Sequence, residues 1–170
     1  PRSTRFPYTP LFRSAVPETA LAARYPAEIQ AFWQQQVKTG SMTTPDGVTL
    51  AYAYVIPRQA RSALLLVQGR TEAYLKYQEL YFDLAAQGVA VFSLDHRGQG
   101  LSPRELADPH KGHISDFALY SQDQQQFIAE IVKTQTQLPL NLLGHSMGGA
   151  VAVQLLAQQS ALFQIGRAHV

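Results

Sequence analysis

The chain has 170 residues, of which 46% are hydrophobic and 15% are charged, and its formal net charge at pH 7 is +2. This composition is typical of one soluble globular domain, and the absence of cysteine excludes disulfide bonds and thiol chemistry. No apolar run approaches the roughly 20 residues that a membrane-spanning helix needs.

Both ends of the sequence look foreign to the rest. Residues 6–14 (FPYTPLFRS) resemble the translation of a short-read sequencing adapter, and residues 165–170 (IGRAHV) resemble one reading frame of its partner. We therefore interpret residues 1–14 and 165–170 as artefacts, and residues 15–164 as the N-terminal part of one domain. Four arginines and no acids lie in these ends, so the remainder carries a net charge of −2 and offers no basic patch for nucleic acid.

The first predicted elements are a short helix and a hairpin. Pro26 suits the first turn of a helix, and the following AEIQAFWQQQ places its large apolar residues on one side, as in a helix on the outside of a domain. The turn Pro45-Asp46-Gly47 then joins predicted strands near residues 37–44 and 48–56. Large apolar residues alternate with smaller ones along the second strand, which favours a place at the margin of a sheet.

From Ser62 onward the pattern changes to strands without alternation. The runs ALLLVQ, VAVFSLD and LNLL are typical of parallel strands that are buried on both faces. Helical patterns separate them, the first ending at Gly88 and the second running from about Tyr120 to Ile131. This order predicts an α/β fold, in which a mostly parallel sheet carries helices on both faces.

The motif GHSMG, residues 144–148, lies between a short apolar strand and an Ala/Val/Leu-rich helix. Gly-x-Ser-x-Gly in this setting predicts a tight turn, in which the serine backbone is strained and the glycines avoid clashes with neighbouring elements. Ser146 Oγ would then stand above the sheet at a helix N-terminus, where unpaired N–H groups favour an anion. We therefore predict that Ser146 is a nucleophile.

A turn without function, a dinucleotide site and a metal site each fit the sequence less well than a nucleophilic serine does. Ordinary turn glycines would not require a buried strand before the serine and an apolar helix after it, and the Gly-x-Gly-x-x-Gly spacing of a dinucleotide site is missing at residues 144–149. Asp108, His110 and His113 share a loop but lack the paired helical histidines of a zinc hydrolase. We interpret them as loop residues and predict no metal and no cofactor.

Three blocks of the chain carry a resemblance to one group of proteins: residues 68–80 (QGRTEAYLKYQEL), 94–113 (LDHRGQGLSPRELADPHKGH) and 144–150 (GHSMGGA). Together they are similar to bacterial lysophospholipases and the related monoacylglycerol lipases of the alpha/beta-hydrolase fold, over about residues 38–164. The resemblance implies a serine ester hydrolase whose substrate is a small lipid ester. These lipases often have His-Gly after the first buried strand, where this chain has Gln68-Gly69.

The resemblance also implies the parts of a site around Ser146. The backbone N–H groups of Met147 and Arg70 would be the oxyanion donors, and Gly69 would permit the close approach that the second donor requires. The Arg70 side chain is a candidate for contacting a phosphate head group. A solvated arginine, or one paired with Glu72, is the alternative.

The acid and the base of a catalytic triad are not found. In this fold they follow the serine, yet no Asp or Glu follows Ser146, and His169 lies in the adapter-like end. Asp95 and His96 are the alternative, but the usual strand order leaves about 10 Å between their strand and that of Ser146, so we interpret them as a structural turn. We expect a fold truncated after the nucleophile helix, with Asn141–Leu143 as its exposed edge strand, and an inactive fragment.

Two interpretations from different classes remain. The first is the lipid ester hydrolase, a cytoplasmic protein with peripheral contact at the inner membrane left open and no nucleic-acid partner. The second is a non-catalytic binding or scaffold domain that keeps the serine turn. Peptidase and acyltransferase activities also occur on this fold.

Overall fold

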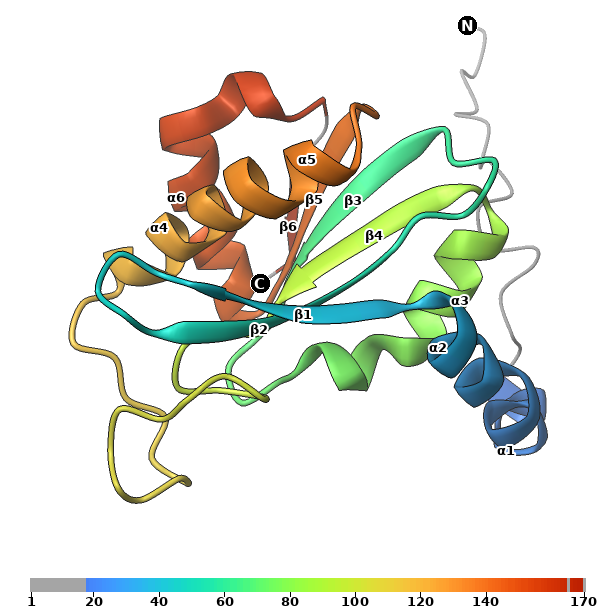
Figure 1. The fold of residues 1–170 in the computed structure, drawn as a ribbon, viewed down its shortest axis with the longest axis horizontal. Helices are drawn as coiled ribbons and strands as arrows, with labels where there is room; N and C mark the ends of the chain where they lie inside the picture. The colour runs from blue at the N-terminus through green and yellow to red at the C-terminus, as the bar shows by residue number, and fades with distance from the viewer. Residues whose placement is uncertain (1–17, 165, 170) are drawn as a thin grey trace, which may run out of the picture.

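The computed structural model describes residues 18–164 and the backbone of residues 166–169, so the adapter-like residues 1–14 lie outside the described residues (Figure 1). A six-stranded sheet in the order β1-β2-β4-β3-β5-β6 forms the centre. The antiparallel hairpin is β1 (Lys38–Thr43) and β2 (Thr49–Val55), and the parallel strands are β3 (Ser62–Val67), β4 (Val89–Leu94), β5 (Leu140–His145) and β6 (Gly166–His169).

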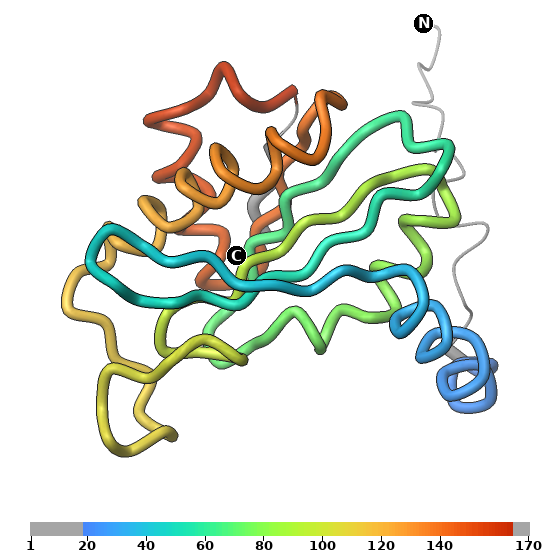
Figure 2. Tube along the Cα trace, viewed as in Figure 1, coloured from blue at the N-terminus to red at the C-terminus, as the bar shows by residue number. Residues whose placement is uncertain are grey.

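Helices cover both faces of the sheet, as predicted (Figure 2). One layer is α1 (Glu18–Arg24), η1 (Tyr25–Ile29), α2 (Gln30–Gln36), η2 (Tyr74–Tyr77) and α3 (Gln78–Ala86). The other is α4 (Ala118–Phe127), η3 (Ile128–Val132), α5 (Lys133–Gln135), α6 (Met147–Gln159) and η4 (Ser160–Leu162). Successive strand residues supply the two cores: Leu65 packs with Phe127 and Leu155, whereas Leu66 packs with Tyr81. This division explains the apolar runs of β3 and β4, because both sides of these strands are buried.

The predicted hairpin and parallel strands are confirmed, but two expectations are wrong. The first helical segment begins at Glu18, and Pro26 lies in the π-helical η1. The π-helical turn begins at Tyr25, and Pro26 follows in its first turn, where proline lacks the N–H that a regular helix would use. At the other end, β6 pairs in parallel with β5, so Asn141–Leu143 is not an edge of the described sheet.

The strand order brings the carboxyl ends of β3, β4 and β5 to one edge of the sheet. β3 lies between β4 and β5, which confirms the predicted separation of the Asp95 segment from that of Ser146. A buried Arg97 on this edge donates to Asp123 of α4 at 2.7 and 2.8 Å and to Asp46 of the hairpin turn at 2.8 Å. These ion pairs connect the loop after β4 to α4 and to the turn between β1 and β2.

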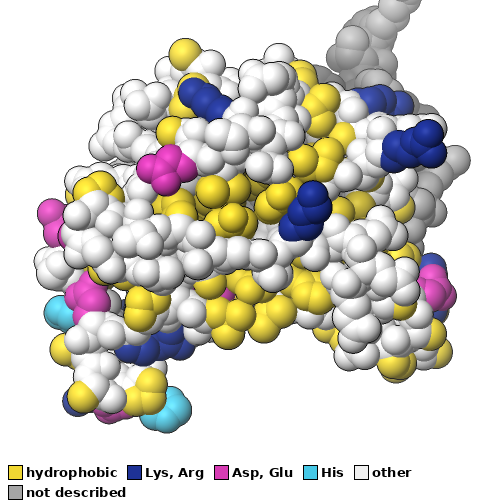
Figure 3. All heavy atoms as spheres, in the orientation of Figure 1, with side chains coloured by type: hydrophobic (Ala, Val, Ile, Leu, Met, Phe, Trp, Pro, Cys, Tyr) yellow, Lys and Arg dark blue, Asp and Glu magenta, His cyan; other side chains and the backbone are white. Residues whose placement is uncertain are grey.

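The surface of the described chain is mainly apolar and neutral where the hairpin crosses it. Figure 3 shows hydrophobic side chains gathered in the middle of this face, with charged side chains sparse among them. Among residues 18–164, no helix combines the length and the apolar character needed to cross a bilayer.

Candidate active site

Ser146 stands at the junction of β5 and α6 in a strained conformation. Its φ of 53° and ψ of −123° are rare for a residue with a side chain, at a cost of about 1–3 kcal/mol. The residue is exposed, its hydroxyl makes no cap hydrogen bond, and its carbonyl accepts the Gly149 N–H at 2.8 Å. The hydroxyl is therefore presented at the N-terminus of α6, as the motif predicts.

Two glycines allow this turn to pack against the end of β3. A Cβ added to Gly148 would lie 2.5 Å from the carbonyl oxygen of Gln68 and closer still to that of Val67. A Cβ on Gly144 would lie 2.5 Å from the carbonyl oxygen of Gly148. These contacts are with backbone atoms, which cannot move aside independently. The predicted need for glycine on both sides of the serine is confirmed.

The loop after β3 lies beside this turn, and its peptide groups are held by buried side chains. The Gly69 N–H donates to Glu72 Oε2 at 2.7 Å, and the Thr71 N–H donates to Gln99 Oε1. Between them, the Arg70 N–H has no acceptor within residues 18–164. As the first residue of α6, Met147 likewise has an N–H without an acceptor in its own helix. Neither of the two N–H groups expected to be oxyanion donors has a hydrogen-bond acceptor among residues 18–164.

Gln68 is a buried hydrogen-bonding residue. Its amide nitrogen donates to Ser93 Oγ at 2.7 Å and to Asp95 Oδ1 at 3.0 Å. Asp95 also accepts the N–H groups of Tyr74 and Leu101, at 2.7 and 2.8 Å, and burial raises its pKa. The side chain at position 68 therefore links the end of β3 to the end of β4.

His96 also supports the loop and does not reach the nucleophile. Its Nε2–H donates to the Gln68 carbonyl at 3.2 Å, and its ring lies against Tyr120. Burial lowers the pKa of His96 to about 4, so the ring is neutral at pH 7. Asp95 and His96 are parts of the scaffold, in agreement with the sequence interpretation.

A carboxylate and a histidine do lie together next to Ser146, and the sequence analysis missed this pair. His145 Nδ1 is 3.2 Å from Glu72 Oε2. No hydrogen bond joins His145 to Ser146 Oγ among the described residues, so the pair is not arranged as the base and orienter of a triad. Glu72 pairs with Lys76 rather than with Arg70, which is exposed and has no ion pair in the described part of the chain. The only feature of the sequence that could have indicated this pair is the acidic residue three positions after Gly69.

Asp108, His110 and His113 lie in the long loop between β4 and α4. Asp108 accepts the backbone N–H of His110 at 3.0 Å, and His113 lies 3.9 Å from Glu105. Residues 18–164 contain no cluster of three or more side chains arranged to hold a metal ion.

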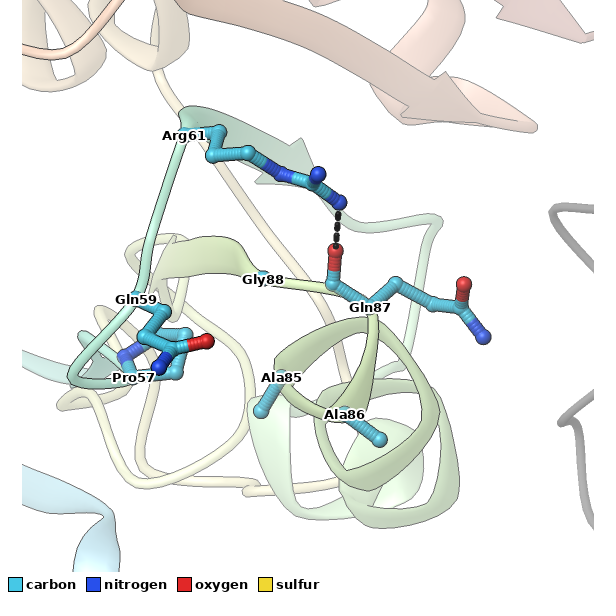
Figure 4. A pocket seen from close by; sticks show the side chains of 7 residues that line it. All are labelled: Pro57, Gln59, Arg61, Ala85, Ala86, Gln87 and Gly88. Carbon is cyan, nitrogen blue, oxygen red and sulfur yellow. Dashed lines mark hydrogen bonds between the residues drawn. The ribbon is translucent and has the colours of Figure 1, made fainter.

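Two hollows on the surface lie at different ends of the sheet relative to Ser146. One of about 440 Å³ lies at the amino ends of β3 and β4, where Arg61 donates to the Gln87 carbonyl at 3.2 Å (Figure 4). It is at the opposite end of the sheet from the serine turn. A smaller hollow of about 170 Å³ includes Thr71, Gln99 and Arg104, next to the loop with the free Arg70 N–H.

Comparisons with known proteins agree with this geometry. A family model described as serine aminopeptidase, S33, matches residues 58–168. The chain is 35% identical to lysophospholipase L2 of Escherichia coli over 82% of this chain and 41% of that protein. It is 33% identical to monoglyceride lipase of Mus musculus over 72% of this chain and 39% of that protein.

A solved structure shows the same fold. A soluble variant of monoglyceride lipase from Saccharomyces cerevisiae matches 85% of this chain and 47% of its own, with a TM-score of 0.68 at 21% identity. The chain therefore has the alpha/beta-hydrolase fold that its sequence resembles. It spans about two fifths of the length of the curated relatives that it matches.

The packing at Gly148 predicts a large difference between two glycine substitutions. We expect Gly148→Ala to lower the free energy of unfolding by about 2 kcal/mol or more, because the new methyl group meets two carbonyl oxygens. Gly112→Ala is the control, since a Cβ there meets nothing within 4 Å. Urea denaturation of both variants measures the difference, and equal stabilities would contradict the close contact.

The buried His96 predicts a loss of stability in mild acid. Its pKa falls from 6.5 to about 4 on folding, so the unfolded chain takes up the proton first and stability declines as pH drops through this window. The contribution lost by pH 4 is about 3 kcal/mol. Urea denaturation between pH 7 and 4 should show a shallower decline in His96→Asn than in the parent. Parallel pH profiles would contradict the assignment.

Proposed function

Because the chain belongs to the serine aminopeptidase S33 family, whose model matches residues 58–168, we propose that the complete protein is a serine hydrolase that cleaves esters of monoacyl lipids. One observation carries the proposal: Ser146 is exposed at a positive φ on the N-terminus of α6, and its hydroxyl is not used as a cap. A strained, glycine-flanked serine of this kind is the form of a nucleophile elbow.

In the proposed reaction, Ser146 Oγ attacks the ester carbonyl carbon, and the carbonyl oxygen becomes an oxyanion. The N–H groups of Met147 and Arg70 are the proposed donors to this oxyanion, each contributing roughly 3 kcal/mol in the transition state. The free Arg70 N–H between the bonded N–H groups of Gly69 and Thr71 supports this role. The proton taken from Ser146 then passes to the ester oxygen, which leaves as an alcohol, and water releases the acyl group from the serine.

The base that takes the Ser146 proton, and the acid that orients it, are proposed to come from residues outside the given chain. Residues 18–164 place no acid or histidine in hydrogen-bond contact with Ser146 Oγ. The match to about two fifths of the curated relatives is consistent with further residues in the complete protein. The boundaries expected from the sequence, with residues 15–164 as the native segment, remain part of this proposal, and the expected cytoplasmic location stays a prediction.

A monoacyl lipid is the proposed substrate class, because the relatives are named lysophospholipase and monoglyceride lipase. The family description names an aminopeptidase, and the names of these relatives favour an ester over a peptide. Arg70 is the proposed contact for a phosphate head group, since its guanidinium is exposed beside the loop and is not paired with Glu72. The alternative of a non-catalytic scaffold domain keeps the same turn without a working base.

Labelling of the serine tests the proposed function. A fluorophosphonate probe should modify the complete protein at Ser146, because an elbow serine with its base is a strong nucleophile. Ser146→Ala should abolish both labelling and hydrolysis of a p-nitrophenyl ester, while Ser160→Ala in η4 should leave both intact. A complete protein that binds lipid but is never labelled would instead support the scaffold alternative.

The head-group role of Arg70 predicts a selective effect. In the complete protein, Arg70→Ala should reduce kcat/KM for a lysophospholipid by about tenfold, the effect of losing one charge-assisted contact. Neutral monoacylglycerol should be affected much less, because the backbone N–H at position 70 is retained. Hydrolysis of both substrates by both proteins measures this selectivity. An equal loss on the two substrates would remove the phosphate role.

A further inference from the structure

Glu72 joins the loop after β3 to the serine turn. Its side chain is 10% exposed, and its two oxygens have different partners. Oε2 accepts the Gly69 N–H at 2.7 Å, the Nδ1–H of His145 at 3.2 Å and the hydroxyl of Tyr77. Oε1 accepts the ammonium group of Lys76. One carboxylate oxygen therefore holds groups from three separate segments.

The carboxylate is ionised at neutral pH. Burial would raise the pKa of Glu72, but hydrogen bonds from Lys76, Tyr77 and the Gly69 N–H outweigh burial and lower the pKa to about 2. An ionised carboxylate only accepts hydrogen bonds, so His145 must carry its proton on Nδ1 to bond with it. The bond therefore turns the Nδ1 side of the imidazole toward Glu72.

The contact is close enough to set the spacing of the segments. A Cβ added to Gly69 would lie 2.8 Å from Glu72 Oε2 and 3.1 Å from His145 Nδ1, so the loop and the turn meet here without intervening space. Gly69 directly precedes Arg70, and His145 directly precedes Ser146. Each bonded residue is thus one peptide unit away from a group assigned to the reaction.

We propose that Glu72 is a positioning residue, which sets the distance between the Arg70 oxyanion donor and the Ser146 nucleophile through Gly69 and His145. The proposal rests on the proposed function of those two groups. Glu72 acts on catalysis without touching the reacting atoms. A donor displaced by about 1 Å loses most of its stabilisation of the transition state, which corresponds to a rate loss of about 100-fold.

A purely structural ion pair with Lys76 is the competing explanation. Lys76 is 59% exposed and contacts only Oε1, whereas the contacts to Gly69 and His145 are made by Oε2. An exposed ion pair contributes little to stability. If Glu72 had only a structural role, its replacement would change the free energy of unfolding. If Glu72 has a positioning role, its replacement would change kcat.

The kinetic test compares Glu72→Ala and Glu72→Gln with Glu130→Gln, a change at an exposed glutamate of η3, all in the complete protein. We expect Glu72→Ala to lower kcat for a p-nitrophenyl ester by about 100-fold with KM within about twofold. Glu72→Gln should recover part of this loss, because its amide oxygen can still accept the Gly69 N–H. Glu130→Gln should match the parent. An unchanged kcat in folded Glu72→Ala would overturn the proposal.

Hydrogen exchange at the Gly69 amide separates this proposal from the proposed function. In Glu72→Ala and Glu72→Gln, exchange at Gly69 should accelerate, by at least about tenfold in the alanine variant, while exchange in β3 stays slow and reports an intact fold. If the parent is not labelled by fluorophosphonate, the proposed function fails, and exchange at Gly69 alone decides whether Glu72 holds the loop. Unchanged exchange at Gly69 would overturn the positioning role in either case.

Discussion

The serine turn depends on a backbone contact between α6 and the end of β3. Gly148 lies so close to the Gln68 carbonyl that no side chain fits between them, and this approach allows the chain to reverse within one residue at Ser146. The positive φ of Ser146 is unfavourable in isolation, so the packing of β5 and α6 against their neighbours must offset the strain. The hydroxyl is exposed as a consequence of that packing.

The same contact places the loop after β3 beside the helix N-terminus, where partly buried peptide groups need partners. Side chains from separate segments supply them: His96 donates to the Gln68 carbonyl, Glu72 accepts from Gly69, and Gln99 accepts from Thr71. An unpaired peptide group in a buried position is costly, so these bonds restrict the loop to one conformation. Arg70 lies between the bonded groups, and its N–H has no acceptor in the described part of the chain.

Much of the site could be predicted because its signals are local in sequence. The turn at Ser146 requires small residues at fixed offsets, and the apolar runs of the parallel strands are continuous in the chain. The contacts of Glu72 could not be predicted, because its partner His145 is 73 residues away and nothing in the sequence separates a buried carboxylate from a solvated one. The first helix was expected to begin at Pro26, because proline suits the first turn of a helix, but α1 begins at Glu18 and η1 continues the helix through Pro26.

The sequence by itself determined the fold class, the position of the strained turn at Ser146 and the glycines around it, since each follows from the conformational limits of neighbouring residues. Tertiary structure alone decided which polar side chains support the loop and that β6 lies beside β5. It also decided that, among the described residues, the N–H groups of Gly69 and Thr71 have acceptors and that of Arg70 has none. The physical reason is that both the support of the loop and the pairing of the strands depend on which buried polar groups form hydrogen bonds with each other. That choice is made between segments far apart in the chain, after the strands have assembled.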